Sequence, residues 1–87
     1  MSHLSPSELS ILLVEPSDTQ RRIIIQRLQQ EGILSIQTAE NIEAAKDIIA
    51  RHKPDLIASA MHFDDGTAID LLGYLRANAD CKDIQFM

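Results

Sequence analysis

Short apolar runs alternate with amphipathic segments along the chain, and this alternation limits the folds it can adopt more than any other feature. The run Ile11–Val14 and the apolar residues within Asp55–Met61 are bounded by turn signals, which is typical of strands covered on both faces. The segment after each run has apolar residues every three or four positions, which predicts a helix. Strands that alternate with helices indicate a parallel sheet with right-handed crossovers.

The first helix is expected to begin near Ser17, because Ser17 and Gln20 have the spacing of a capping box. Pro16 ends the strand before it, since proline cannot donate to a strand ladder. Gly32 marks the end of the helix. Its apolar positions, Ile24, Ile25 and Leu28, recur at three and four residues.

A second strand is predicted over Ile33–Thr38, although polar residues interrupt its aliphatic pattern. Asn41 is the expected cap of the second helix, which should end near His52, before Pro54. The predicted buried stripe of this helix consists of Ile42, Ala45, Ile48 and Ile49.

A loop, His62–Gly66, should follow the third strand. Thr67 and Asp70 have capping-box spacing and predict the start of a third helix. A fourth strand is expected over Asp83–Met87. The predicted inner face of the third helix consists of Ala68, Leu71, Leu72 and Leu75.

The chain has 87 residues and is 45% hydrophobic and 24% charged, which fits one small globular domain. Residues 1–9 are interpreted as a flexible lead-in with one helical turn at Ser5–Glu8, and residues 10–87 as the domain. The predicted order is strand then helix, three times, followed by a strand. No shorter sequence repeat is present.

Charge and cysteine content exclude several classes of function. Thirteen acidic against eight basic residues give a net charge of −5, which argues against a nucleic-acid partner gripped through its phosphates. Cys81 is the single cysteine, so an intrachain disulfide is impossible and an intracellular protein is indicated. No apolar run approaches the roughly 18 residues of a membrane span, and no signal peptide is recognisable. A cytoplasmic protein without a membrane partner is expected.

In parallel sheets of this kind, ligands bind at the carboxyl ends of the strands. Glu15, Pro16, Ala60 and the loop His62–Gly66 are therefore the positions where a site is expected. Glu15 is open to three interpretations: a surface acid, a group that hydrogen-bonds in the crevice, or a remnant of ancestry.

Each of the other polar candidates has both a functional and a non-functional interpretation. Asp64 and Asp65 are either a displaced acid site or a solvated turn, and His62 either accepts a group or is polar surface. Arg21 and Arg22 either contact a partner or are a solvated pair. No Gly-rich phosphate cradle, HExxH motif or nucleophile elbow is present, so an independent enzyme is not expected.

The segments ILLVEPSDTQRRIIIQRLQQEG, SIQTAEN, KPDLIASAMHFDDGTAIDLLGYLR and DIQFM together resemble the receiver domain of bacterial response regulators. The resemblance covers nearly all of Ser10–Met87. Its most specific parts are the strand entry Pro-Asp-Leu-Ile and the helix Asp70–Arg76. It implies a three-layer α/β/α, flavodoxin-like parallel sheet with strand order 2-1-3-4. It also implies a domain truncated within its fourth strand, to about (βα)3β.

In that family a histidine kinase donates a phosphoryl group to an aspartate at the end of the third strand. That aspartate and an acid pair after the first strand hold magnesium. The resemblance places the phosphoacceptor on Ala60 and the acid pair on Glu15 and Pro16. A methyl group cannot attack phosphorus, and Glu15 alone offers too few oxygen ligands for magnesium. No cofactor is therefore expected.

The remaining functional positions of the family are also changed. Its loop proline falls on Asp64, and its Asp-Gly pair falls on Thr67 and Ala68. Its switch hydroxyl and its lysine would lie beyond Met87.

Three hypotheses follow from the resemblance. The first is a pseudo-receiver that works without aspartyl phosphorylation, through contacts with a histidine kinase, an output domain or another receiver. The second is an unorthodox receiver phosphorylated on Asp64 or Asp65. The third is a dimerisation or tethering piece of a larger regulator, with a homodimer formed through the exposed sheet edge or through the uncovered Ile24 and Leu28 face of the first helix.

Overall fold

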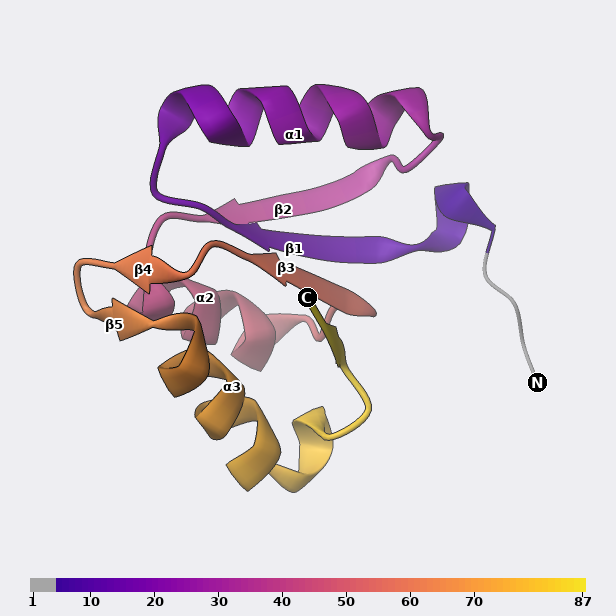
Figure 1. Ribbon diagram of the computed structural model, residues 1–87. Helices are drawn as coiled ribbons and strands as arrows, with labels where there is room; N and C mark the ends of the chain where they lie inside the picture. Colours follow the sequence, from indigo (N-terminus) through magenta and orange to yellow (C-terminus); the bar gives the residue numbers. More distant parts are fainter. Residues whose placement is uncertain (1–4) are drawn as a thin grey trace.

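A computed structural model describes residues 5–87 as a parallel sheet with helices on both faces (Figure 1). The sheet strands are β1 (Ser10–Val14), β2 (Ser35–Ala39), β3 (Leu56–Ser59) and β6 (Gln85–Phe86). The helices are α1 (Asp18–Gln30), α2 (Ile42–Arg51) and α3 (Ala68–Ala77), with the 3-10 turns η1 (Pro6–Glu8) and η2 (Ala79–Cys81). The short strands β4 (His62–Phe63) and β5 (Gly66–Thr67) form a separate antiparallel hairpin.

The order of the parallel strands is β2-β1-β3-β6, which is 2-1-3-4 when the hairpin strands are left out. This confirms the predicted flavodoxin-like order. Strand β1 lies in the middle, with Val14 opposite Ala39 of β2 on one side and opposite Ser59 of β3 on the other. Both of its edges are therefore paired, and its four apolar residues are buried.

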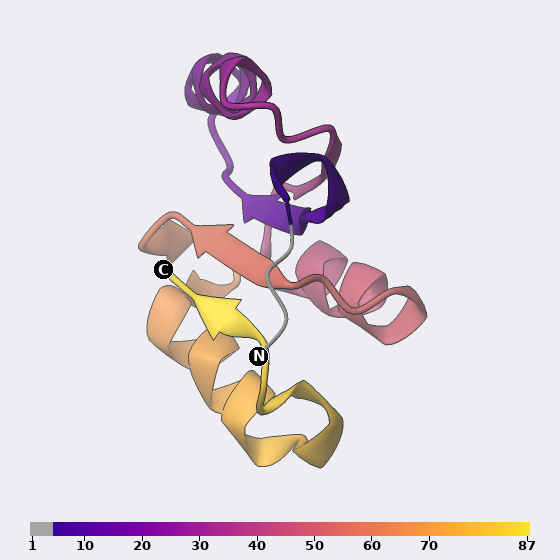
Figure 2. The same ribbon diagram turned by 90° about the vertical axis from the view of Figure 1, so that its right-hand side faces the viewer.

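The two faces of the sheet are covered unequally. Helix α1 lies alone on one face, and α2 and α3 lie on the other (Figures 1 and 2). Helices α2 and α3 each bury three side chains, and all of these except Ala68 join the main hydrophobic core with residues of β1 and β3. The buried residues of the two helices are Ile42, Ala45, Ile49, Ala68, Leu71 and Leu75.

The apolar residues of α1 are buried less completely than those of α2 and α3. The helix has no fully buried side chain, and Ile24, Ile25 and Leu28 are only half-buried. The physical reason is that, within residues 5–87, no second helix lies beside α1 to close the space around it (Figure 2).

Local signals set the predicted starts of all three helices. The Ser17 hydroxyl accepts a hydrogen bond from the Gln20 amide at 3.2 Å, and the Asn41 side chain accepts one from the Ala44 amide at 2.8 Å. At the start of α3, the Asp70 carboxylate accepts a hydrogen bond from the Thr67 amide at 2.9 Å, which is one contact of the predicted capping box. After α1, Gly32 takes a φ of 87°, a left-handed conformation that glycine adopts without strain.

Several strand boundaries differ from those predicted. Strand β3 ends at Ser59 rather than Met61, because the chain turns there toward the hairpin. Strand β2 begins at Ser35, and Leu34 before it is 72% exposed. The predicted irregular loop after β3 instead contains β4 and β5.

The predicted lead-in is described only in part. Residues 1–4 lie outside the described residues, and Pro6–Glu8 forms the single helical turn that was expected there. Cys81 packs in the core and is 1% exposed. Within residues 5–87, no helix is long and apolar enough to cross a bilayer.

Replacing Ile57 by alanine tests the position of the core. Ile57 on β3 is 0% exposed, so Ile57→Ala should lower the free energy of unfolding by about 2–5 kcal/mol through lost burial and a residual cavity. Ile69→Ala is the matched control, because Ile69 is 72% exposed and its loss should cost under about 0.5 kcal/mol. Urea unfolding followed by circular dichroism measures both, and equal losses would contradict the assignment of the core.

Candidate functional site

The carboxyl ends of β1 and β3 bring together the three positions singled out in the sequence. Val14 and Ser59 are register partners, so Glu15 and Ala60 follow directly from neighbouring strands. The Ala60 amide donates to the Val14 carbonyl at 2.9 Å, which extends the pairing by one residue. Glu15, Pro16 and Ala60 therefore lie together at the carboxyl ends of the strands, where the site was expected.

Glu15 takes part in the turn that leads into α1. Its Oε2 atom accepts a hydrogen bond from the Ser17 amide at 3.0 Å, and its backbone carbonyl accepts one from Nη1 of Arg21 at 2.9 Å. The residue is half-buried, while Pro16 beside it is exposed. Of the three interpretations left open for Glu15, the structure supports a hydrogen-bonding role within this turn.

Arg21 is more than a solvated residue. Its side chain is 17% exposed, and Nη2 forms ion pairs with Asp18 and, at 3.7 Å, with Glu40. The guanidinium thereby links the turn after β1 to the end of β2, whereas Arg22 is exposed. The spacing of Asp18 and Arg21 signalled the first ion pair, but the contact with Glu40 depends on the tertiary fold.

A cavity of about 290 Å³ lies at the carboxyl ends of β1 and β3, on the side of the sheet that α1 covers. Most of the residues that line it are apolar, and Glu15 and Ser59 are the two polar ones. The Ser59 hydroxyl donates to the Ala60 carbonyl at 2.7 Å. The lining residues are Leu13, Glu15, Ile24, Ala58, Ser59, Ala60 and Met87.

Two findings limit the chemistry of this cavity. Ser59 lines the same cavity as Ala60, although successive residues of a regular strand point to opposite faces, because the regular strand ends at Ser59. The set Glu15, Pro16 and Ala60 contains one carboxylate, which does not fit the oxygen-rich, octahedral shell of magnesium. Within residues 5–87, no group of three or more His, Cys, Asp and Glu side chains is placed to hold a metal ion.

The two adjacent acids after β3 occupy the turn of the hairpin and differ in their surroundings. Asp64 is exposed. The carboxylate of Asp65 accepts two backbone hydrogen bonds at the start of α2, from the Ile42 amide to Oδ1 and from the Glu43 amide to Oδ2, each at 3.0 Å. The hydrogen bond from Ile42, more than any other contact, lowers the pKa of Asp65 below 3.8. His62, on β4, is exposed and pairs with Thr67 through the backbone.

Comparison with solved structures identifies the fold as that of receiver domains. An aspartate-to-alanine variant of the MaeR response regulator, bound to sulfate, matches with a TM-score of 0.82 and 28% identity over 91% of this chain and 64% of its own. The signal receiver domain of a signal transduction histidine kinase from Syntrophus aciditrophicus matches with a TM-score of 0.85 and 26% identity, over 90% of this chain and 58% of its own.

The non-phosphorylated receiver domain of HemR from Leptospira biflexa is also similar, with a TM-score of 0.77 and 26% identity, over 90% of this chain and 60% of its own. The chain thus spans less than two-thirds of the length of these structures. Comparisons with protein-family models and with curated protein sequences found no match. The structural neighbours of this chain are response-regulator receiver domains, and its flavodoxin-like sheet is the receiver fold.

The contact between Asp65 and α2 predicts a specific pH dependence of stability. Because the pKa of Asp65 is lower in the folded protein, its carboxylate stabilises the fold above pH 3.8, and this contribution disappears as the pH falls through the lower, folded pKa. Wild type should therefore be more stable than Asp65→Asn near neutral pH, and the difference should shrink below pH 3.8.

Urea unfolding at a series of pH values measures this difference. Asp64→Asn is the matched control, because it removes an equal charge one residue away. The same pH profile for both variants would exclude a specific role for the Asp65 contact.

Proposed function

We propose that this chain, which has the receiver fold, is a signalling module of a two-component system that works through protein contacts without aspartyl phosphorylation. The observation that carries the proposal is Ala60, which stands at the end of β3, beside the end of β1. The resemblance of the sequence to receiver domains assigns the phosphoacceptor to this position. A methyl group has no lone pair with which to attack phosphorus.

The surroundings of Ala60 support the same proposal. Magnesium would need several oxygen ligands to offset the charge of a transferring phosphoryl group, and the side chains of Ala60 and Pro16 supply none. Glu15 has one carboxylate oxygen engaged by the Ser17 amide. The side chains at the carboxyl ends of β1 and β3 therefore do not fit magnesium, and no step of the proposed function depends on magnesium.

A receiver without a phosphoryl group needs another way to set the conformation of its contact surface. A bound partner can do so if it binds one conformation more tightly than the other, and the sequence can do so by stabilising one conformation outright. The proposed partners are a histidine kinase, an output domain or another receiver. No catalytic role is proposed for the chain itself.

Incubation with acetyl phosphate and magnesium, followed by intact-protein mass spectrometry, tests the proposal. Wild type should form no stoichiometric adduct, because Ala60 cannot be phosphorylated. The control is the double variant Ala60→Asp, Pro16→Asp, which restores carboxylates at both positions and shows whether the crevice geometry can support the reaction.

An adduct on wild type would overturn the proposal. If that adduct mapped to the hairpin turn and vanished in an Asp64→Asn, Asp65→Asn double variant, the alternative of an unorthodox phosphoacceptor would take its place. Both oxygens of Asp65 accept amides of α2, so the exposed Asp64 would be the first residue to examine.

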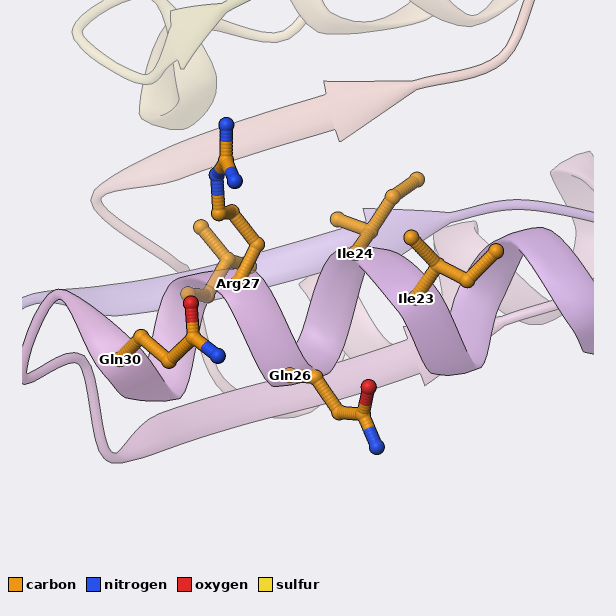
Figure 3. A pocket seen from close by; sticks show the side chains of 6 residues that line it. Ile23, Ile24, Gln26, Arg27 and Gln30 are labelled. Atoms are coloured by element: carbon orange, nitrogen blue, oxygen red, sulfur yellow. The ribbon is translucent and has the colours of Figure 1, made fainter.

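The uncovered side of α1 favours a second candidate function, a dimerisation or tethering piece of a larger regulator. Figure 3 shows Ile23, Ile24 and Arg27 projecting from one side of α1, with Gln26 turned away. Ile23 is 55% exposed, and the groove along this helix has a volume of about 490 Å³. Apolar surface left open in this way is typical of protein interaction sites.

Self-association through α1 is tested by sedimentation velocity over a range of concentrations. If the groove forms a homodimer, Ile23→Asp should weaken association at least about tenfold, because it places a charge in an apolar contact. Ile69→Asp on α3 is the control, because Ile69 is also exposed but lies on the opposite face of the sheet. A wild-type protein that stays strictly monomeric would count against this second function.

A further inference from the structure

Three consecutive residues of the hairpin, Asp65, Gly66 and Thr67, contact the first turns of two different helices. The Asp65 carboxylate accepts hydrogen bonds from the Ile42 and Glu43 amides of α2. These partners lie 23 and 22 residues earlier in the chain, so the contact joins elements that are distant in sequence. We call this segment, residues 65–67, the hairpin latch.

Helix α2 already has a local cap, so capping alone does not account for Asp65. The Asn41 side chain accepts a hydrogen bond from the Ala44 amide, as a local N-cap does. The amides of Ile42 and Glu43 have no partner inside the helix, and Asp65 supplies their acceptors. The first turn of α2 is thus completed only when the hairpin lies against it.

Gly66 brings the hairpin backbone into close contact with both helices. A Cβ atom added at this position would lie 2.7 Å from Cδ1 of Ile42 and 2.7 Å from Oδ2 of Asp70. Its φ of 148° is also one that residues with side chains rarely adopt. The two atoms are the ends of side chains that can shift, so the φ is the stronger reason for a glycine at this position.

Thr67 attaches the other end of the latch to α3. Its amide and its hydroxyl both donate to Oδ2 of Asp70, at 2.9 and 3.3 Å. The Ala68 amide donates to the Met61 carbonyl at 2.8 Å and closes the base of the hairpin. Phe63 is half-buried and packs against the hydrophobic core. The segment between β3 and α3 is therefore held at its base, at its tip and on one side.

We propose that the hairpin latch holds the segment after Ala60 in a single conformation, so that its exposed surface is set by the sequence rather than by a phosphoryl group. Met61 and Ile69, which are 55% and 72% exposed, lie at the base of this segment. Their positions on the surface therefore depend on the conformation of the segment. The role of the latch in signalling rests on the proposed function. The coupling between the hairpin and α2 does not, and is measured separately.

Amide hydrogen exchange followed by NMR tests the coupling, with Asp65→Ala as the variant. Loss of the carboxylate should speed exchange at the Ile42 and Glu43 amides about tenfold. If the hairpin is latched to α2, the backbone amides of Gly66 and Thr67 should exchange faster by a similar factor. Methyl relaxation dispersion at Met61, flat in wild type, should then report exchange between conformations.

Two further variants make the result specific. Asp64→Asn is the matched control and should leave the exchange rates at all four amides unchanged. Asp65→Asn keeps one carbonyl acceptor, so it should fall between wild type and Asp65→Ala and provides a folded comparison if the alanine variant unfolds. Faster exchange at Ile42 and Glu43 with no change in the hairpin would mean that Asp65 caps α2 without coupling the hairpin to it. That result would overturn the proposed latch.

The acetyl phosphate experiment separates the latch from the proposed function. An adduct on wild type together with coupled exchange would refute phosphorylation independence and leave the latch standing. Uncoupled exchange without an adduct would refute the latch alone.

Discussion

The rest of the structure depends on β1 being paired on both edges and covered on both faces. Ile11, Leu12, Leu13 and Val14 are each at most 2% exposed, so burying this strand requires a neighbour on each side and a helix layer above and below. Parallel neighbours in turn require crossover helices, which the chain supplies as α1 and α2. The same pairing places the residues that follow β1 and β3 side by side at the carboxyl end of the sheet, where they form the candidate site.

The helices cover the two faces of the sheet to different extents, so the protein presents two kinds of surface. On one face, α2 and α3 close a continuous hydrophobic core. On the other, α1 is the only helix within residues 5–87 and has no fully buried side chain, and the groove along it is lined by three aliphatic and three polar residues. The hairpin lies against the first face, where Phe63 packs on the hydrophobic core.

The carboxyl ends of β1 and β3 combine regular strand pairing with the small apolar side chain of Ala60. The strand pairing, the turn after β1 and the capped start of α3 are all present, while the end of β3 carries the methyl group of Ala60. A segment that is free to move can respond to a ligand, whereas one held by several contacts keeps a single conformation unless its partner contributes enough free energy to release it. The contacts of residues 65–67 place the segment after Ala60 in the second class.

The sequence by itself determined the order of the elements, the helix starts at Ser17, Asn41 and Thr67, and the presence of an alanine at the end of β3. These features depend on a local apolar period or on a cap within three residues, so a short stretch of chain specifies them. Only the tertiary structure decided the role of Asp65, because its partners on α2 are more than twenty residues away. It also decided how far each side chain of α1 is buried, because a helix with an apolar stripe is buried only where another element packs against it.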